Sequence, residues 1–192
     1  MTLVALTGRT VAFLVATEGV EQVELTSPWQ AVAEAGGTPR LLSTQPGRVR
    51  AVRHFVPADT FAVDDVVGEV GPERYDGLVL PGGVANPDLL RTDRAAVAFV
   101  RALCASGRPV AVICHGPWTL VEADAVRGRT LTSWPSVRTD LVNAGAHWVD
   151  EEVHVCREGL GVLVSSRGPD DLPVFNDTVV TEFAHAAAAR RH

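Results

Sequence analysis

The chain has 192 residues, 46% of them hydrophobic and 21% charged, which suffices for one globular domain with a sizeable core. The formal net charge is −6, and basic residues cluster only at Arg190-Arg191-His192, so we expect no stable binding to nucleic acid. Every basic side chain other than histidine is arginine. The absence of lysine excludes Schiff-base chemistry and a lysine general base.

The three cysteines, Cys104, Cys114 and Cys156, form no Cys-x-x-Cys pair, which is typical of a protein from a reducing compartment. Residues 1–16 lack the basic start of a signal peptide, and no apolar run is long enough to span a bilayer. We therefore expect a cytoplasmic protein. We further expect residues 1–192 to form a single α/β domain, with residues 1–9 as a short extension.

Apolar runs alternate with helical patterns along the chain. Strands are predicted at residues 11–16, 39–43, 77–81 and 110–113, and shorter ones at residues 129–132, 153–156 and 162–165. Helices are predicted at residues 27–35, 93–106, 118–123, 137–144 and 172–191. Residues 45–65 favour short antiparallel or edge strands. Residues 21–26 are either an earlier turn of the helix kinked at Pro28 or a separate turn. The alternation predicts a doubly wound α/β/α sandwich.

A thiol stands where the strand at residues 110–113 meets a helix. Cys114-His115 ends the strand, and Gly116-Pro117 opens the helix, where proline costs no hydrogen bond. This pattern is a nucleophile elbow with cysteine in the place of serine. Because a helix N-terminus and an imidazole both favour thiolate, we expect Cys114 to be reactive with a lowered pKa. The alternative is that Cys114 is a structural cysteine packed in an apolar strand. For Cys104, Cys156 and His154 we favour a structural role.

Two other strand ends carry polar or flexible groups. Glu18 and Glu21 follow the first strand, and Gly82-Gly83 follows the third. In a doubly wound sheet the carboxyl ends of the strands meet at one edge, so these groups and Cys114 are expected together. A buried carboxyl group there could donate to the sulfur, and glycine N–H groups could approach an oxyanion. Alternatively, the glycines form a tight turn without a catalytic role.

The chain resembles the PfpI intracellular-protease family, which shares a superfamily with the parkinsonism-associated protein deglycase. The resemblance rests on Ala111-Val-Ile-Cys-His-Gly-Pro117, Val79-Leu-Pro-Gly-Gly83 and Val23-Glu-Leu25. It continues through Thr132-Ser-Trp-Pro135, Asn143-Ala-Gly145, Trp148-Val-Asp150 and Val164-Ser-Ser-Arg167, and so covers nearly the whole chain. It implies a flavodoxin-like fold of the class I glutamine-amidotransferase type.

The resemblance also implies a set of site residues. Cys114 becomes the nucleophile and His115 its neighbouring base. Counting back from Val23-Glu-Leu25 assigns the family's elbow glutamate to Glu21, with Glu24 inside the motif but outside the catalytic position. The implied oxyanion site consists of Gly83 and the backbone N–H of His115. With the flanking glycines, the expected oxyanion and substrate-binding set is Gly82, Gly83 and Gly116.

The chain departs from the pattern of the peptidase-like members, which complete a Cys-His-Glu triad with a carboxylate from a neighbouring subunit. Pro87 stands at the matching position and Asp88 one residue later. Asp88 either serves as this carboxylate from a shifted loop or caps a turn at Leu89. A glutamine amidotransferase is excluded because His185 has no glutamate partner late in the chain. The remaining histidines show no ligand spacing, so we expect neither metal nor cofactor.

The function implied is a cofactor-independent thiol enzyme acting on methylglyoxal or its adducts, in a homo-oligomer of at least two chains. Two alternatives remain. One is an intracellular cysteine peptidase that depends on Asp88. The other is a redox-sensing stress protein or chaperone without turnover, in which Cys114 is oxidised.

Overall fold

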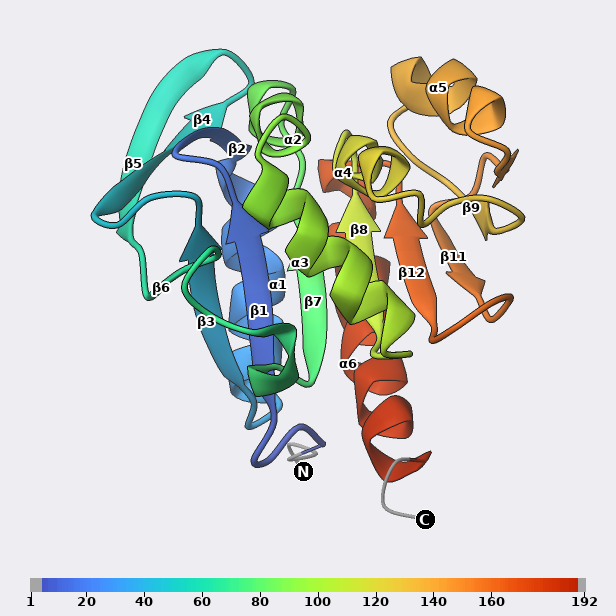
Figure 1. Cartoon of the computed structure of the whole chain (residues 1–192), viewed down its shortest axis with the longest axis horizontal. Coiled ribbons are helices and arrows are strands. Elements are labelled where there is room, and N and C mark those ends of the chain that lie inside the picture. Colours follow the sequence, from blue (N-terminus) through green and yellow to red (C-terminus); the bar gives the residue numbers. More distant parts are fainter. Residues whose placement is uncertain (1–4, 190–192) are drawn as a thin grey trace.

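The computed structural model describes residues 5–189, within which seven strands form a central sheet (Figure 1). Their order is β11-β12-β8-β7-β1-β3-β6, and all neighbours pair in parallel except β11 and β12. The strands are β1 (Thr10–Val15), β3 (Thr38–Ser43), β6 (Asp65–Val66), β7 (Gly77–Leu80), β8 (Val110–Ile113), β11 (Val153–Cys156) and β12 (Leu163–Ser166). The sheet confirms the predicted α/β fold with a mostly parallel sheet.

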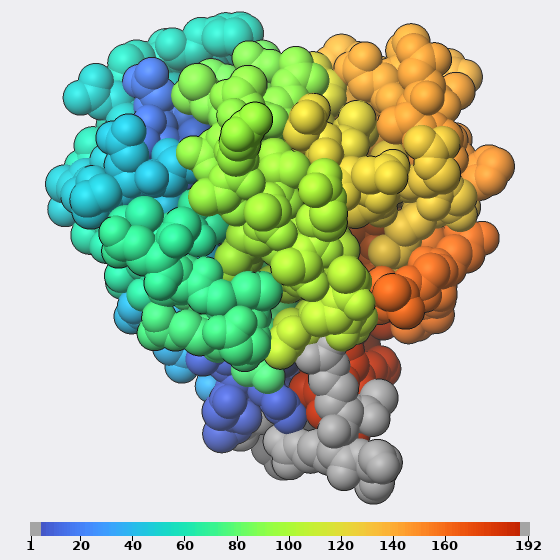
Figure 2. Space-filling view, in the orientation of Figure 1, coloured from blue at the N-terminus to red at the C-terminus, as the bar shows by residue number. Residues whose placement is uncertain are grey.

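Helices cover both faces of this sheet. One face carries α1 (Gln22–Glu34) and α6 (Leu172–Ala189), and the other carries α2 (Ala85–Leu90), α3 (Arg94–Ala105) and α4 (Pro117–Glu122). The remaining helical elements are α5 (Arg138–Asn143) and the 3-10 turns Pro72–Arg74, Pro135–Val137 and Pro169–Asp171. Figure 2 shows the segment of α2 and α3 lying across the middle of one face.

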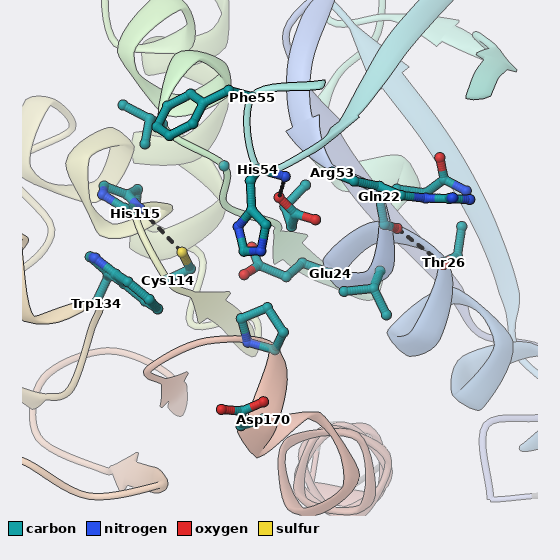
Figure 3. Close-up of a pocket in the computed structure, with 15 residues that line it drawn as sticks. Gln22, Glu24, Thr26, Arg53, His54, Phe55, Cys114, His115, Trp134 and Asp170 are labelled. Carbon is teal, nitrogen blue, oxygen red and sulfur yellow. Dashed lines mark hydrogen bonds between the residues drawn. The ribbon is translucent and has the colours of Figure 1, made fainter. Parts of the chain in front are cut away.

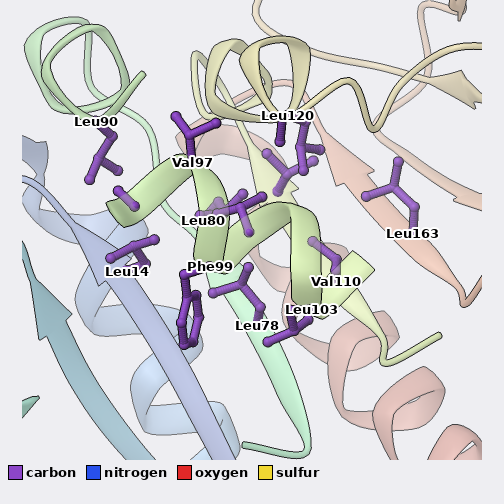
Figure 4. Packing of buried hydrophobic residues seen from close by; sticks show 14 of the residues in the cluster. Leu14, Leu78, Leu80, Leu90, Val97, Phe99, Leu103, Val110, Leu120 and Leu163 are labelled. Carbon is purple, nitrogen blue, oxygen red and sulfur yellow. The ribbon is translucent and has the colours of Figure 1, made fainter. Parts of the chain in front are cut away.

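The core is divided by the alternation of side chains along the strands. On β8, Val110 and Val112 pack towards α3 and α4, while Ala111 and Ile113 pack towards α1 and α6. Figure 4 shows the first of these clusters, where α3 contributes Phe99 and Leu103. All four residues of β8 are buried, as expected for a strand between helical layers. The strand that ends at Cys114 is thus held from both sides.

Two small sheets flank the main one. The strands β2 (Glu18–Glu21), β4 (Arg48–Arg53) and β5 (Val56–Ala62) form one, and β9 (Thr130–Leu131) pairs with β10 (His147–Trp148) in the other. Strands β4 and β5 form the antiparallel pair expected within residues 45–65. The elements β2, α2 and β10 were not predicted from the sequence, and each has only two to six residues.

The ends of the chain join the same body where the structure describes them. Leu6 is buried against the cluster around Phe13, and its N–H donates to the carbonyl of Ala35. The first four residues of the expected extension, and Arg190-Arg191-His192, lie outside the described residues. Among residues 5–189 no helix has the length and apolar character needed to cross a membrane.

Candidate active site

The central feature of the site is the turn that presents Cys114. Cys114 follows β8 with a φ of 63°, in the left-handed region that costs an L-residue roughly 1–2 kcal/mol. Gly116 caps the next helix and Pro117 is its first residue, so α4 begins where the sequence predicts. This strained strand-to-helix turn is the geometry of a nucleophile elbow. It directs the thiol to the edge of the sheet where the strands end. Cys114 is only 6% exposed there.

Cys114 lies in a cavity of about 830 Å³ (Figure 3). The cavity walls are the first turn of α1, the turn between β4 and β5, the Gly83-Val84 segment after β7, and Trp134. His115 lines it beside Cys114, and Asp170 lies at its rim. The site therefore combines segments from six separate regions of the chain.

Glu24, rather than Glu21, is the carboxyl group that contacts the thiol. Its side chain is fully buried, lies beside Cys114, and accepts the N–H of Gly82 at 2.9 Å. Burial raises the pKa of Glu24 to about 8, so it keeps its proton at neutral pH. A buried protonated carboxyl group beside the sulfur was expected, but its assignment to Glu21 was wrong.

Glu21 occupies a different position because β2 ends there and α1 begins one residue later. Its carboxylate accepts the backbone N–H of His54, at the tip of the β4–β5 hairpin, at 2.8 Å. Residues 22–26 are a continuous part of α1, which contains Pro28. In that helix the buried positions are Glu24, Leu25, Pro28 and Val32. Extending the helical pattern back across Pro28 would have placed Glu24 on the buried face.

His115 contacts both the thiol and a second polar group. Its Nδ1 lies 3.1 Å from Cys114 Sγ, and its Nε2 lies 3.3 Å from Ser136 Oγ. The ring packs against Trp118 and Trp134 at centroid distances of 5.2 and 5.9 Å. Burial lowers the pKa of His115, so the imidazole is neutral at physiological pH and able to accept a proton. No sequence motif pointed to Ser136.

The expectation of a lowered pKa for Cys114 was wrong. Burial, followed by the negative charge of ionised Glu24, raises the pKa of the Cys114 thiol. The backbone N–H groups of Gly83 and His115 act in the opposite direction by hydrogen-bonding to the sulfur, but they do not compensate. The helix behind the thiol has only six residues. Protonated Glu24 carries no negative charge that opposes ionisation of the thiol. The Cys114 thiolate is therefore favoured only while Glu24 is protonated.

The three predicted glycines have different surroundings. Gly83, with a φ of 81°, lines the cavity and packs closely on Gly19 and Glu21, where no side chain would fit. The N–H of Gly82 is bonded to Glu24, and that of Gly116 is bonded to the carbonyl of Ile113 at 3.0 Å. Of the three N–H groups, only that of Gly83 is directed at the sulfur, so an oxyanion donor is available at Gly83 and not at Gly82 or Gly116.

The other predicted residues lie outside this arrangement. The carboxylate of Asp88 is exposed on α2 and pairs with Arg91 at 2.7 Å. Cys104 packs against the core, and Cys156 is buried in it. His154 bonds to Glu151 at 2.8 Å. Within the described residues no group of three or more His, Cys, Asp or Glu side chains could hold a metal ion.

Comparisons with known proteins agree with this architecture. The model of the DJ-1/PfpI family matches residues 9–182. Protein/nucleic acid deglycase 2 of Escherichia coli is 41% identical over 160 residues, covering 83% of this chain and 90% of the relative. A deglycase of Pyrococcus horikoshii is 41% identical over 162 residues, covering 84% of this chain and 92% of the relative.

A solved structure gives the same result for the fold. A two-domain protein of Anabaena variabilis, with DJ-1/ThiJ/PfpI-like and ferritin-like domains, superposes with a TM-score of 0.82 at 30% identity. The match covers 94% of this chain and 49% of that protein, so this chain spans about half its length. The sequence matches and the shared fold lead to one conclusion: the chain belongs to the DJ-1/PfpI family.

Proposed function

We propose that the protein is a cofactor-independent deglycase that removes methylglyoxal-type adducts from amines, guanidines or thiols, with Cys114 as nucleophile. The curated relatives at about 40% identity that are named deglycases support this class of reaction. The observation that carries the proposal is the contact of the Cys114 thiol with two proton-transfer groups, a protonated Glu24 and a neutral His115.

The first step forms a bond between sulfur and carbon. His115 Nδ1 takes the thiol proton as Sγ bonds to the adduct carbon that is attached to the carrier. The C–N or C–S bond to the carrier breaks, and the amine, guanidine or thiol leaves with a proton. Free methylglyoxal reacts in the same way without a leaving group. In both cases the product is a hemithioacetal on Cys114, and Glu24 and the N–H of Gly83 stabilise its oxygen.

The second step is an internal rearrangement that needs no external oxidant. One proton moves from the former aldehyde carbon to the neighbouring ketone carbon, and the hydroxyl proton moves from the first carbon's oxygen to the second's, so the first carbon is oxidised as the second is reduced. The product is a lactate thioester of Cys114. Water then cleaves the thioester, which releases lactate and restores the thiol. His115, within reach of the sulfur, accepts and returns the protons.

Enantiomer-resolved detection of lactate formed from methylglyoxal tests the proposal. We expect the wild-type protein to form lactate catalytically with a stereochemical bias, and Cys114→Ala to form none above background. Cys104→Ala, which alters a thiol away from the cavity, should retain the wild-type rate. Loss of aldehyde without lactate would reflect reversible adduct formation and would contradict the proposed chemistry.

We also propose a cytoplasmic homo-oligomer. The three cysteines are all free, in keeping with a reducing compartment, and the family resemblance implies at least a dimer. Sedimentation equilibrium of the purified protein tests the oligomeric state, and a monomer at micromolar concentration would contradict it.

A further inference from the structure

The cavity is much larger than the three-carbon group on which Cys114 is proposed to act. Its volume of about 830 Å³ is in the range that encloses a drug-sized ligand. Methylglyoxal has five non-hydrogen atoms and would fill only a small part of it. The remaining walls are therefore available for the molecule that carries the adduct.

The wall facing Cys114 is the tip of the β4–β5 hairpin. Arg53 pairs with Val56, so His54 and Phe55 form a two-residue turn between the strands. His54 has a φ of 57°, a conformation for which such turns usually use glycine or asparagine. Figure 3 shows the His54 ring directed into the cavity and Phe55 at its edge. A strained turn with these two rings is thus placed over the site.

Glu21 holds this tip in place. Its carboxylate accepts the N–H of His54 at 2.8 Å, at the residue with the unfavourable φ. Glu21 belongs to β2, which pairs with β4, and it directly precedes the helix that carries Glu24. The hydrogen bond therefore connects the hairpin tip to the segment that positions the catalytic carboxyl group.

Exposed apolar side chains surround the mouth of the cavity. Phe55 is 87% exposed, Val84 43% and Trp134 41%, and all three line the cavity. Hydrophobic side chains gathered around a concave site mark a contact surface for a ligand. The charged groups at the same cavity are Glu21, Asp170 and Arg53, in a chain with a net charge of −6. These charges favour binding of a peptide over binding of the polyanionic backbone of a nucleic acid.

We propose that the tip formed by His54 and Phe55, together with Val84 and Trp134, recognises the peptide that carries the adduct, and that Glu21 is its positioning residue. This inference rests on the proposed deglycase function and deepens it. An apolar residue next to the modified side chain packs against Phe55 and Trp134, while the adduct reaches Cys114. The tip makes no contribution to the chemistry of the three-carbon group itself.

The test compares methylglyoxal adducts on two carriers, N-acetylarginine amide and the tripeptide acetyl-Phe-Arg-Phe-amide. Phe55→Ser is expected to lower kcat/KM for the tripeptide adduct about tenfold through KM, the effect of losing one aromatic contact, and to leave the amino-acid adduct within about twofold. The control is Val56→Ser, which alters a 66% exposed neighbour that does not line the cavity and should change neither value. Equal losses on both carriers, or no loss on the tripeptide, would overturn the proposal.

Two further variants separate the tether from the ring. Glu21→Gln retains an oxygen that accepts the His54 N–H and should behave as wild type, whereas Glu21→Ala should raise KM for the tripeptide adduct with little change in kcat. A Glu21→Ala loss confined to kcat would contradict a positioning role.

Binding keeps the two proposals distinguishable. Calorimetric titration of Cys114→Ala with the tripeptide adduct needs no turnover, and the added Phe55→Ser change should weaken the affinity about tenfold. If the wild type turns over neither adduct but this difference in affinity persists, the deglycase function fails and the recognition surface stands. Preferential binding of a methylglyoxal-modified oligonucleotide, lost in Phe55→Ser, would assign the surface to nucleic acid and overturn the peptide proposal.

Discussion

The carboxyl group of Glu24 lies beside Cys114, although the two residues are ninety positions apart in the sequence. Both groups are buried, and ionised Glu24 opposes ionisation of the thiol. One proton shared by the pair is therefore more stable than two negative charges. This relationship makes the protonation of Glu24 the condition for a reactive sulfur.

Replacing each glutamate with glutamine distinguishes the role of Glu24 from that of Glu21. Glu24→Gln should lower the rate of lactate formation at least about 100-fold, because general acid-base catalysis contributes that much or more. Glu21→Gln is the matched control and should stay within about threefold of wild type, because its carboxylate bonds to His54 and not to the thiol. The measurement is kcat/KM for methylglyoxal. Equal losses in both variants would contradict the assignment of the catalytic carboxyl group to Glu24.

Stability should depend on pH through Glu24. Its pKa rises from 4.5 to about 8 on folding, so between these values the folded chain retains a proton that the unfolded chain releases. The free energy contribution of Glu24 is thus fully present below the lower pKa and is lost as pH rises towards about 8. Urea denaturation should therefore show Glu24→Gln gaining stability relative to wild type across this window. A difference independent of pH would contradict the raised pKa.

The rate at which Cys114 is alkylated should depend on whether residue 24 carries a negative charge. In Glu24→Gln the negative charge that raises the pKa of Cys114 is absent, so thiolate forms at lower pH. Mass spectrometry of iodoacetamide labelling should show faster modification of Cys114 than in wild type at mildly alkaline pH. Cys104 is the internal reference, because burial raises its pKa to about 11 without any contribution from Glu24. Parallel acceleration of both cysteines would indicate general loosening of the fold.

The close approach of Gly82 to the pair can be tested with alanine. A Cβ at Gly82 would lie 2.5 Å from Glu24 Oε2 and 2.6 Å from Cys114 Cβ. Gly82→Ala should destabilise the fold by about 2 kcal/mol or reduce activity by displacing Glu24. At Gly68 the nearest atom is the Ala95 Cβ at 3.5 Å, so Gly68→Ala should be nearly neutral. Thermal denaturation together with activity assays tests this prediction. A fully active and stable Gly82→Ala variant would contradict the close packing of Gly82 against Glu24 and Cys114.

The sequence by itself determined the main strands of the sheet and the turn that presents Cys114. Uninterrupted β-branched runs identify buried parallel strands, and the residues after β8 encode a sharp turn into a helix. These are local properties, set by side-chain shape and by the backbone freedom of glycine and proline. The predicted strand at residues 110–113 accordingly coincides with β8.

Only the tertiary structure decided which glutamate meets Cys114 and how the thiol ionises. A shift of three residues moves a carboxyl group from the hairpin tip at Glu21 to the sheet edge at Glu24, and this choice depends on where α1 begins. The raised pKa of Cys114 follows from burial against that carboxyl group, a contact between distant segments. Desolvation and through-space charge depend on the packed neighbours of the thiol. The local sequence alone therefore predicted the wrong direction for the pKa shift of Cys114.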